Sequence, residues 1–241
     1  MIGKPIDVIF CGNDYNDASF YKLCYPESQI YYFERDEISS TKIRQNPYLY
    51  WDWLPNVVKP YYVKKVLLIG GESTGKSTLS INLANYYNTN YVEEVGKELS
   101  EKSGTDSMML LEDFEEILIK HRLKVIEAAE KSNKVLFIDT DSLVTKFYLN
   151  LLMKDNLERW MYNELADAIS ALNTYDLILF LESDVDFVDV DRTEEIKNNR
   201  VLYSEKLKKM LTEHGLEFET ISGDYFNRFN SAVALVDKLL K

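Results

Sequence analysis

The stretch VLLIGGESTGKSTLSINLANYY, Val66 to Tyr87, joins a short apolar run to a Gly-rich turn and then to a segment with helical spacing. Within it, Gly70 to Ser77 fits the pattern G-x-x-x-x-G-K-[ST], which in this strand-turn-helix context is typical of a phosphate-binding loop, or P-loop. Glycines let successive backbone N–H groups curl around phosphates at the start of a helix, where the helix dipole also favours an anion. The sequence therefore predicts a nucleotide-binding α/β protein built around this loop.

The residues of this loop have predicted roles in binding ATP. Lys76 is expected to neutralise the outer phosphates, and the Ser77 hydroxyl is expected to ligate Mg2+. The alternative is a Gly-rich turn whose lysine is merely exposed, and the strand and helix on either side argue against it. The residues expected to contact the nucleotide are Gly70, Gly71, Glu72, Ser73, Thr74, Gly75, Lys76, Ser77 and Thr78.

From Val66 onward, short apolar runs alternate with longer amphipathic segments, which predicts a doubly wound parallel sheet of the P-loop NTPase type. The strands expected in this sheet are Val66–Ile69, Tyr91–Glu93, Val135–Ile138, Leu177–Leu181 and Phe218–Ile221. The expected helices are Thr78–Tyr87, Asp113–Lys131, Leu143–Leu152, Leu157–Leu172, Ser204–His214 and Phe226–Leu240.

Acidic residues follow two of these strands, where a P-loop protein needs a partner for its metal ion. In KVLFIDTD, Asp139 is placed to hold the Mg2+ shell, directly or through water, and Asp141 to face the substrate or act as a base. Alternatively, one of the two only N-caps the helix that follows. Of Glu93 and Glu94, we expect one to reach into the same crevice and the other to be a solvated charge.

An acidic excursion from Glu182 to Asn199 has the length of a closing lid. Such a lid would keep water away from phosphoryl transfer. Arg192 and Arg200 are predicted to contact the phosphates of ATP, where a guanidinium offsets charge on the transferring group. The alternative is that both are exposed arginines paired with nearby acids. A small P-loop protein with a lid is expected to be a kinase that uses ATP and Mg2+.

Composition narrows the range of partners. Among 241 residues, 28 Lys and Arg stand against 40 Asp and Glu, and the net charge of −12 argues against unspecific binding to nucleic acid or to an anionic membrane. The two cysteines, Cys11 and Cys24, form no zinc-binding pattern with His121 or His214. Because we also find no signal-peptide layout and no apolar run long enough to span a bilayer, we expect a cytoplasmic protein.

Several motifs together resemble one family. GGESTGKSTL, EEVGKEL, VLFIDTDSLVT, a lid and GDYFNRF follow one another as in the ribosylnicotinamide kinase domain of NadR-type NAD-biosynthesis proteins. This resemblance covers Val66 to Lys241 and implies transfer of the ATP γ-phosphate to the 5′-hydroxyl of nicotinamide riboside, giving nicotinamide mononucleotide. It also matches Glu94 to the family's E-Y-G-R element, and Asp139 and Asp141 to its F-I-D-T-D.

The chain departs from the family pattern around the lid. Asp189 and Arg192 fit the family's W-V-x-D-G-x-R, but Asp186 and Phe187 stand around the position where the family has an aromatic residue. Lys97 stands where the family usually has arginine. The arginine guanidinium can bind a planar partner through two parallel hydrogen bonds, whereas the lysine ammonium is a single point charge. The acceptor could therefore be bound more weakly or be another nucleoside.

The residues before Val66 show a second, smaller pattern. Asp7–Cys11 and Gln29–Phe33 are predicted strands around a helix at Asn16–Cys24. ISSTKIR, at Ile38–Arg44, with the aromatic run after it, resembles the end of the nicotinamide mononucleotide adenylyltransferase domain of the same proteins. The residues thereby implied to meet ATP phosphates at a helix start are Ser39, Ser40, Thr41 and Arg44.

We therefore expect residues 1–62 to be the C-terminal part of a nucleotidyltransferase-like domain and residues 63–241 to be the kinase-like domain. The H-x-G-H element of an adenylyltransferase is missing from this sequence. Residues 1–62 could be a packing annex, a half-domain completed by a separate partner chain, or part of a fragment.

Two functions of other classes compete with a kinase. A DNA-binding regulator is disfavoured by the net charge and by the lack of a helix-turn-helix segment. A sensor that binds nucleotide without turnover is disfavoured because the chain retains Lys76, Ser77 and Asp139. These are the residue types that bind Mg2+ and phosphate for catalysis, and a sensor without turnover would not need them.

Overall fold

The computed structural model describes residues 5–13, 19–34, 38–97, 99, 109–186 and 197–241. The chain forms two compact units, Met1–Leu54 and Pro55–Lys241. Each unit is described by itself below. None of the helices in the described ranges is long and apolar enough to cross a membrane.

The larger unit is built, in its described part, on a five-stranded parallel sheet, which confirms the predicted fold class. Its strands are β3 (Lys64–Gly70), β4 (Tyr91–Val92), β5 (Val135–Asp139), β6 (Leu177–Leu181) and β7 (Glu219–Ile221), in the spatial order β4-β5-β3-β6-β7. From β3 the chain continues to strands on one side and later returns to add strands on the other. The strand order therefore reverses at β3, and ligands of open α/β sheets bind at the carboxyl ends of the strands at such a point.

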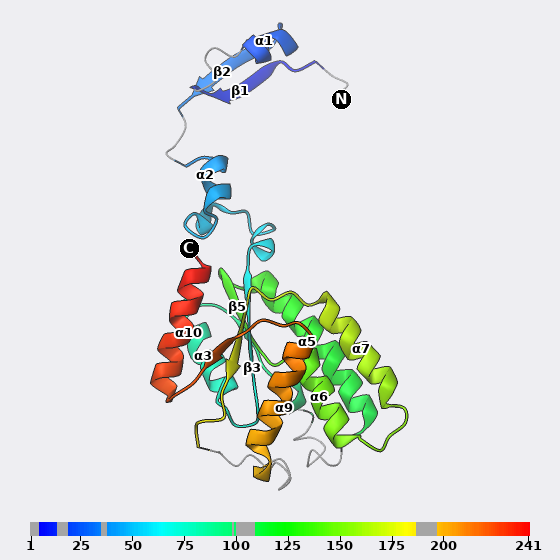
Figure 1. Cartoon of the computed structure of the whole chain (residues 1–241). Coiled ribbons are helices and arrows are strands. Elements are labelled where there is room, and N and C mark those ends of the chain that lie inside the picture. The colour runs from blue at the N-terminus through cyan, green and yellow to red at the C-terminus, as the bar shows by residue number, and fades with distance from the viewer. Residues whose placement is uncertain (1–4, 14–18, 35–37, 98, 100–108, 187–196) are drawn as a thin grey trace. The chain divides into compact units, whose positions relative to one another are not determined.

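Helices cover both faces of this sheet, as Figure 1 shows. One face carries α3 (Lys76–Tyr87) and α10 (Tyr225–Leu239). The other carries α5 (Leu111–Lys131), α6 (Ser142–Leu152), α7 (Arg159–Leu172) and α9 (Arg200–Glu213). Most of these helices lie within two residues of their predicted starts, but α9 begins four residues before the predicted start at Ser204. Helix α5 begins two residues early, where the Asp113 carboxylate caps it by accepting from the Leu110 N–H at 2.7 Å.

The unbroken apolar runs of the central strands are buried on both faces, as such a pattern predicts. In β3, Val66 to Ile69 are all 0% exposed. The core between the sheet and the first pair of helices contains Val66, Leu68, Leu79, Leu83, Ala84, Val135, Phe137, Leu179, Leu181, Ile221, Ala232 and Val236. This core holds the carboxyl ends of β3 and β5 and the start of α3 in fixed positions.

The smaller unit contains a parallel pair of strands, β1 (Val8–Gly12) and β2 (Gln29–Phe33), connected through α1 (Ser19–Cys24). Helix α2 (Ser40–Gln45) follows, and the Ser39 side chain caps it by accepting from the Lys42 N–H at 3.2 Å. The predicted helix start within ISSTKIR is therefore confirmed. The first residues of the helix predicted at Asn16–Cys24 lie outside the described residues.

The aromatic run after α2 forms two short 3-10 helices, η2 (Trp51–Trp53) and η3 (Lys59–Tyr61). Trp51 is buried and stacks on Tyr48 with ring centroids 6.3 Å apart. Helix η3 contacts α5 and belongs to the larger unit, Pro55–Lys241.

The packing of α3 against the sheet can be tested at Leu83, which is 0% exposed. We expect Leu83→Ala to lower the free energy of unfolding by about 3 kcal/mol, because it removes buried methyl groups and leaves a cavity. Urea denaturation followed by circular dichroism measures this loss. The matched control is Leu157→Ala, at a position that is 90% exposed, where we expect a change within about 0.5 kcal/mol. Equal effects at the two positions would contradict the packing described.

Candidate active site

The P-loop connects β3 to α3, and its glycines are required by close contacts. A Cβ atom at Gly70 would lie 2.6 Å from the carbonyl oxygen of Leu181. Gly75 has a positive φ of 84°, and a Cβ there would lie 2.9 Å from Cε1 of Tyr225. Both positions therefore need glycine, since backbone or ring atoms would clash with any side chain.

Inside the loop, one carbonyl organises two side chains. The Lys76 ammonium is buried and donates to the carbonyl oxygen of Gly71 at 3.0 Å, and the Thr74 hydroxyl donates to the same oxygen at 3.0 Å. Lys76 is thus folded back over the loop, where the phosphates of a nucleotide would enter. Thr78 is exposed in the first turn of α3.

Arg200, at the start of α9, contacts the outer side of the loop. Its guanidinium donates to the carbonyl oxygens of Glu72 at 3.0 Å, Ser73 at 3.1 Å and Val185 at 2.8 Å. The sequence predicted that Arg200 contacts phosphate directly. In this structure, its described hydrogen bonds hold the backbone of the loop.

Arg228, in α10, holds the loop from a second side and was missed by the sequence analysis. It is 1% exposed and donates to the carbonyl oxygens of Thr74 at 2.6 Å, Glu182 at 2.8 Å and Gly223 at 2.7 Å. It also pairs with the Asp184 carboxylate. One guanidinium thereby joins the P-loop to the segments that follow β6 and β7.

Asp139, at the end of β5, faces the start of α3. The Ser77 hydroxyl donates to Oδ2 of Asp139 at 2.6 Å. Burial raises the pKa of Asp139, whereas the charge of Lys76 and the hydrogen bonds from Ser77 and Thr140 oppose that rise. A hydroxyl and a carboxylate at this distance fit a hard cation such as Mg2+, which takes oxygen ligands and completes its shell with water and phosphate. The described residues contain no cluster of three or more His, Cys, Asp or Glu that could hold a metal ion.

The turn after β5 is held in a strained conformation. Thr140 has a φ of 70°, which is unusual for a β-branched residue. Its N–H donates to the Leu68 carbonyl at 3.0 Å. His121 from α5 lies 3.2 Å from the Asp139 carbonyl oxygen, and burial lowers the pKa of His121 to about 4, so a neutral ring donates there from Nε2.

Asp141 caps α6, which is one of the two alternatives that the sequence left open, and its role toward a substrate stays a prediction. Its Oδ1 N-caps α6 by accepting from the N–H groups of Leu143 at 3.0 Å and Val144 at 3.3 Å. The Tyr175 side chain also hydrogen-bonds to the buried Asp141 carboxylate, and the Asp141 side chain lines a pocket. Burial raises the pKa of Asp141 to about 6, opposed by the two backbone N–H groups.

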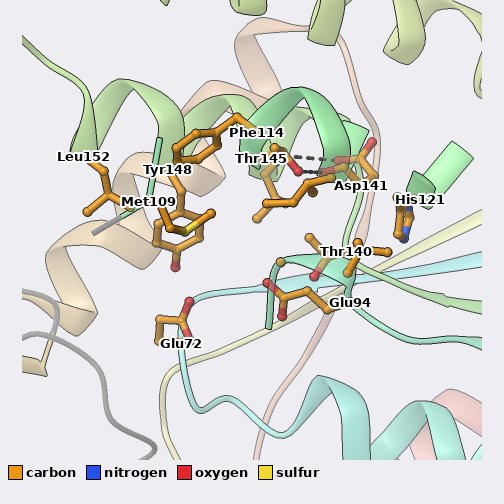
Figure 2. A pocket seen from close by; sticks show the side chains of 14 residues that line it. Glu72, Glu94, Met109, Phe114, His121, Thr140, Asp141, Thr145, Tyr148 and Leu152 are labelled. Atoms are coloured by element: carbon orange, nitrogen blue, oxygen red, sulfur yellow. Dashed lines mark hydrogen bonds between the residues drawn. The ribbon is translucent and has the colours of Figure 1, made fainter. Parts of the chain in front are cut away.

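This pocket opens beside the P-loop and has about 550 Å³ of space, its open mouth included. Figure 2 shows Glu72 and Glu94 on one side, and Phe114, Met109 and Tyr148 on another. Its lining residues are Glu72, Glu94, Val95, Gly96, Met109, Phe114, Ile117, His121, Thr140, Asp141, Val144, Thr145, Tyr148 and Leu152. A mostly apolar pocket with a few polar groups is typical of a small-molecule site.

The structure thus brings together many of the residues that the sequence selected. Lys76, Ser77 and Asp139 meet at the loop, and Glu94 and Asp141 meet in the pocket beside it. Three residues of the predicted lid, Asp189, Arg192 and Phe187, lie outside the described residues. Lys97 and Asp186 are exposed.

The loop, its buried lysine and the aspartate opposite Ser77 place the chain among the P-loop nucleotide-binding proteins. A family model described as an AAA domain matches residues 65–228, and the chain therefore belongs to that family.

Two curated relatives extend the similarity over most of the chain. They are the proteins named "Trifunctional NAD biosynthesis/regulator protein NadR" in Salmonella typhimurium and Escherichia coli, each 33% identical over 207 residues, or 84% of this chain. The expected homology to NadR-type proteins is confirmed. The match covers 49% of each relative, so the chain spans about half the length of the curated relatives it matches.

Solved structures agree on the fold. A NadR protein in complex with NR has a TM-score of 0.77 at 23% identity, covering 100% of this chain and 70% of that chain. A NadR protein with NAD and AMP-PNP has a TM-score of 0.73 at 24% identity, covering 97% of this chain and 66% of that chain. A deoxyadenosine kinase from M. mycoides has a TM-score of 0.54 at 12% identity, covering 72% and 99%.

The support that Arg228 gives to the loop can be tested by Arg228→Lys. Lysine keeps the charge but cannot reach the carbonyls of Thr74, Glu182 and Gly223 together, so we expect the free energy of unfolding to fall by about 3 kcal/mol. Urea denaturation measures this change. The control is Arg159→Lys, a half-buried arginine that donates to the backbone carbonyl of Met153. A loss at Arg228 no larger than at Arg159 would show that the buried contacts are not needed.

Proposed function

We propose that the chain is an ATP-dependent kinase that phosphorylates the 5′-hydroxyl of nicotinamide riboside. The observation that carries this proposal is the position of an acid-lined pocket directly beside the P-loop, with Glu72 belonging to both. Two ligands named for the similar structures support it, because NR and AMP-PNP correspond to an acceptor and an ATP analogue. The homology to proteins named for NAD biosynthesis supports it further.

Residues of the P-loop would bind ATP and Mg2+, and residues of the pocket would bind the acceptor. Backbone N–H groups of the loop and Lys76 would hold the outer phosphates of ATP, and Ser77 with Asp139 would hold Mg2+. When bound, the ion would neutralise charge on the β- and γ-phosphates. Of the three carboxylates that line the pocket, Glu94 or Asp141 would accept a proton from the acceptor hydroxyl.

The reaction forms one bond and breaks another. The 5′-oxygen of the riboside bonds to the γ-phosphorus while the bond from that phosphorus to the bridging oxygen of ADP breaks. The hydroxyl proton passes to a pocket carboxylate, and ADP leaves. Lys76, 3.0 Å from the Gly71 carbonyl, would stay close to the developing charge throughout.

We further propose that the protein acts in the cytoplasm. Both cysteines are free thiols, Cys11 buried and Cys24 exposed. Free thiols are typical of a reducing compartment, where ATP is also abundant.

The kinase can be tested by incubating the purified chain with Mg2+, ATP and nicotinamide riboside and separating the products by chromatography. We expect nicotinamide mononucleotide and ADP in equal amounts. Lys76→Ala should lower turnover by at least about a hundredfold, because it removes the charge facing the transferring phosphate. The matched control, Lys238→Ala on the exposed side of α10, should keep the activity. No mononucleotide from the unaltered chain would overturn the proposal.

For the smaller unit we propose an accessory role without adenylyl transfer of its own. The described part of this unit offers one element of such an ATP site, the start of α2 that Ser39 caps. The alternative is that a partner chain completes a nucleotidyltransferase with this unit. Both versions concern residues 1–62, which include the smaller unit, Met1–Leu54.

This proposal predicts the outcome of a second incubation. With Mg2+, ATP and nicotinamide mononucleotide, we expect the chain alone to form no NAD, whereas the riboside reaction proceeds under the same conditions. Chromatography of the products gives the answer. NAD formed by the chain alone would contradict the accessory role.

A further inference from the structure

The segment GDYFNRF, Gly223–Phe229, leads from β7 into α10 beside the P-loop. The Asp224 side chain caps α10 by accepting a backbone N–H at 2.8 Å. In the next turn, Arg228 donates to the carbonyl oxygen of Thr74 at 2.6 Å. The first turn of α10 is therefore fixed to the P-loop, and Tyr225 is the first residue of that turn.

The ring of Tyr225 lies against the P-loop at Gly75. A Cβ atom at Gly75 would lie 2.9 Å from Cε1 and 3.7 Å from Cδ1 of this ring. Tyr225 is also close to Arg200, since burial lowers the pKa of Arg200 and the Tyr225 phenol is among the groups that oppose this fall. Tyr225 nevertheless remains 51% exposed. An aromatic ring with open surface is thus held at the edge of the loop that binds phosphate.

Tyr225 and the acceptor pocket belong to different faces of the sheet. Helices α3 and α10 cover one face, and α5 and α6 cover the other, as Figure 1 shows. The pocket takes its helical lining from α5 and α6, and none of its described lining residues belongs to α10. The γ-phosphate of ATP must face the acceptor, and the nucleoside is attached at the other end of the triphosphate. The nucleoside is therefore expected on the side away from the pocket, where Tyr225 lies.

We propose that the adenine base of ATP stacks on Tyr225, which makes this residue part of the site for the phosphate donor. The proposal rests on the proposed function, in which ATP is that donor. Every base has a flat π face, and stacking on an aromatic side chain strengthens the binding of a nucleotide. Because the capped turn and the contact with Gly75 already hold the ring, little side-chain freedom is lost when a base binds.

The test compares two ligands that differ by the nucleoside. ADP and inorganic pyrophosphate both carry two linked phosphates, and only ADP carries adenosine. Neither is a phosphate donor in the proposed reaction, so calorimetry in the presence of Mg2+ measures both dissociation constants without turnover. We expect the unaltered chain to bind ADP more tightly than pyrophosphate by about tenfold or more.

Two substitutions separate the ring of Tyr225 from its hydroxyl. Tyr225→Leu removes the π face but keeps an apolar side chain beside Gly75, and it should raise the Kd of ADP by about tenfold while the Kd of pyrophosphate stays unchanged. Tyr225→Phe keeps the ring and should keep the affinity for ADP. An equal loss in the two variants would contradict stacking, because the hydroxyl would then be the group that matters. Equal losses for ADP and pyrophosphate in Tyr225→Leu would also contradict it, because Tyr225 would then support the loop and not the base.

The matched control is Tyr86→Leu, which makes the same chemical change in the last turn of α3. Tyr86 is 59% exposed, and its ring packs on Phe229 with the centroids 5.6 Å apart. We expect both dissociation constants to stay as in the unaltered chain. A loss of ADP affinity as large as that in Tyr225→Leu would show that the position beside the P-loop is not what matters, and the proposal would fail.

The proposed function and the stacking fail in distinguishable ways. If nicotinamide riboside is not phosphorylated but Tyr225→Leu loses affinity for ADP alone, the kinase proposal fails and the stacking stands. If the riboside is phosphorylated and Tyr225→Leu binds ADP as the unaltered chain does, the kinase stands and the stacking is overturned. If the unaltered chain binds neither ADP nor pyrophosphate, the nucleotide site and the stacking are overturned together.

Discussion

A P-loop must turn its N–H groups toward the bound phosphates, and this turns several of its carbonyl oxygens away from them. Those carbonyls need donors, because a buried backbone oxygen without a partner is costly. Here two guanidinium groups supply them. Arg200 binds the carbonyls of Glu72 and Ser73, and Arg228 binds that of Thr74. The rest of the site is arranged around a loop that these arginines hold from α9 and α10.

The same two arginines fix segments that are distant in sequence. Arg228 also joins the carbonyls after β6 and β7, and Arg200 reaches the carbonyl of Val185. The loop is therefore held in one conformation by several elements at once. With its backbone fixed, the direction of the Glu72 side chain is also constrained, and this residue of the P-loop lines the neighbouring pocket.

Much of this fold could be predicted because its signals are local. The apolar runs of β3, β5 and β6 are long enough to be recognised, and the P-loop pattern marks the turn between β3 and α3. The directions of the side chains were harder to predict from the sequence, because they depend on tertiary contacts. The pattern did assign Glu72 to the loop, but nothing local indicates that its side chain lines the neighbouring pocket.

The sequence does contain an indication that Arg228 is buried. It is spaced four and eight residues before Ala232 and Val236, the buried positions of α10, so a charged residue stands in an apolar stripe. For Asp141 the sequence offered two alternatives, of which the structure shows the cap of α6, and the side chain also lines the pocket. The lid, including Arg192, stays a prediction.

Helix α5 connects two sides of the site. It carries Phe114 on the pocket wall and His121 against the carbonyl of Asp139, the residue that faces Ser77. A displacement of α5 would therefore alter the pocket and the surroundings of Asp139 together. Two ligands that each favoured one position of α5 would be coupled through it, and that coupling would be reciprocal.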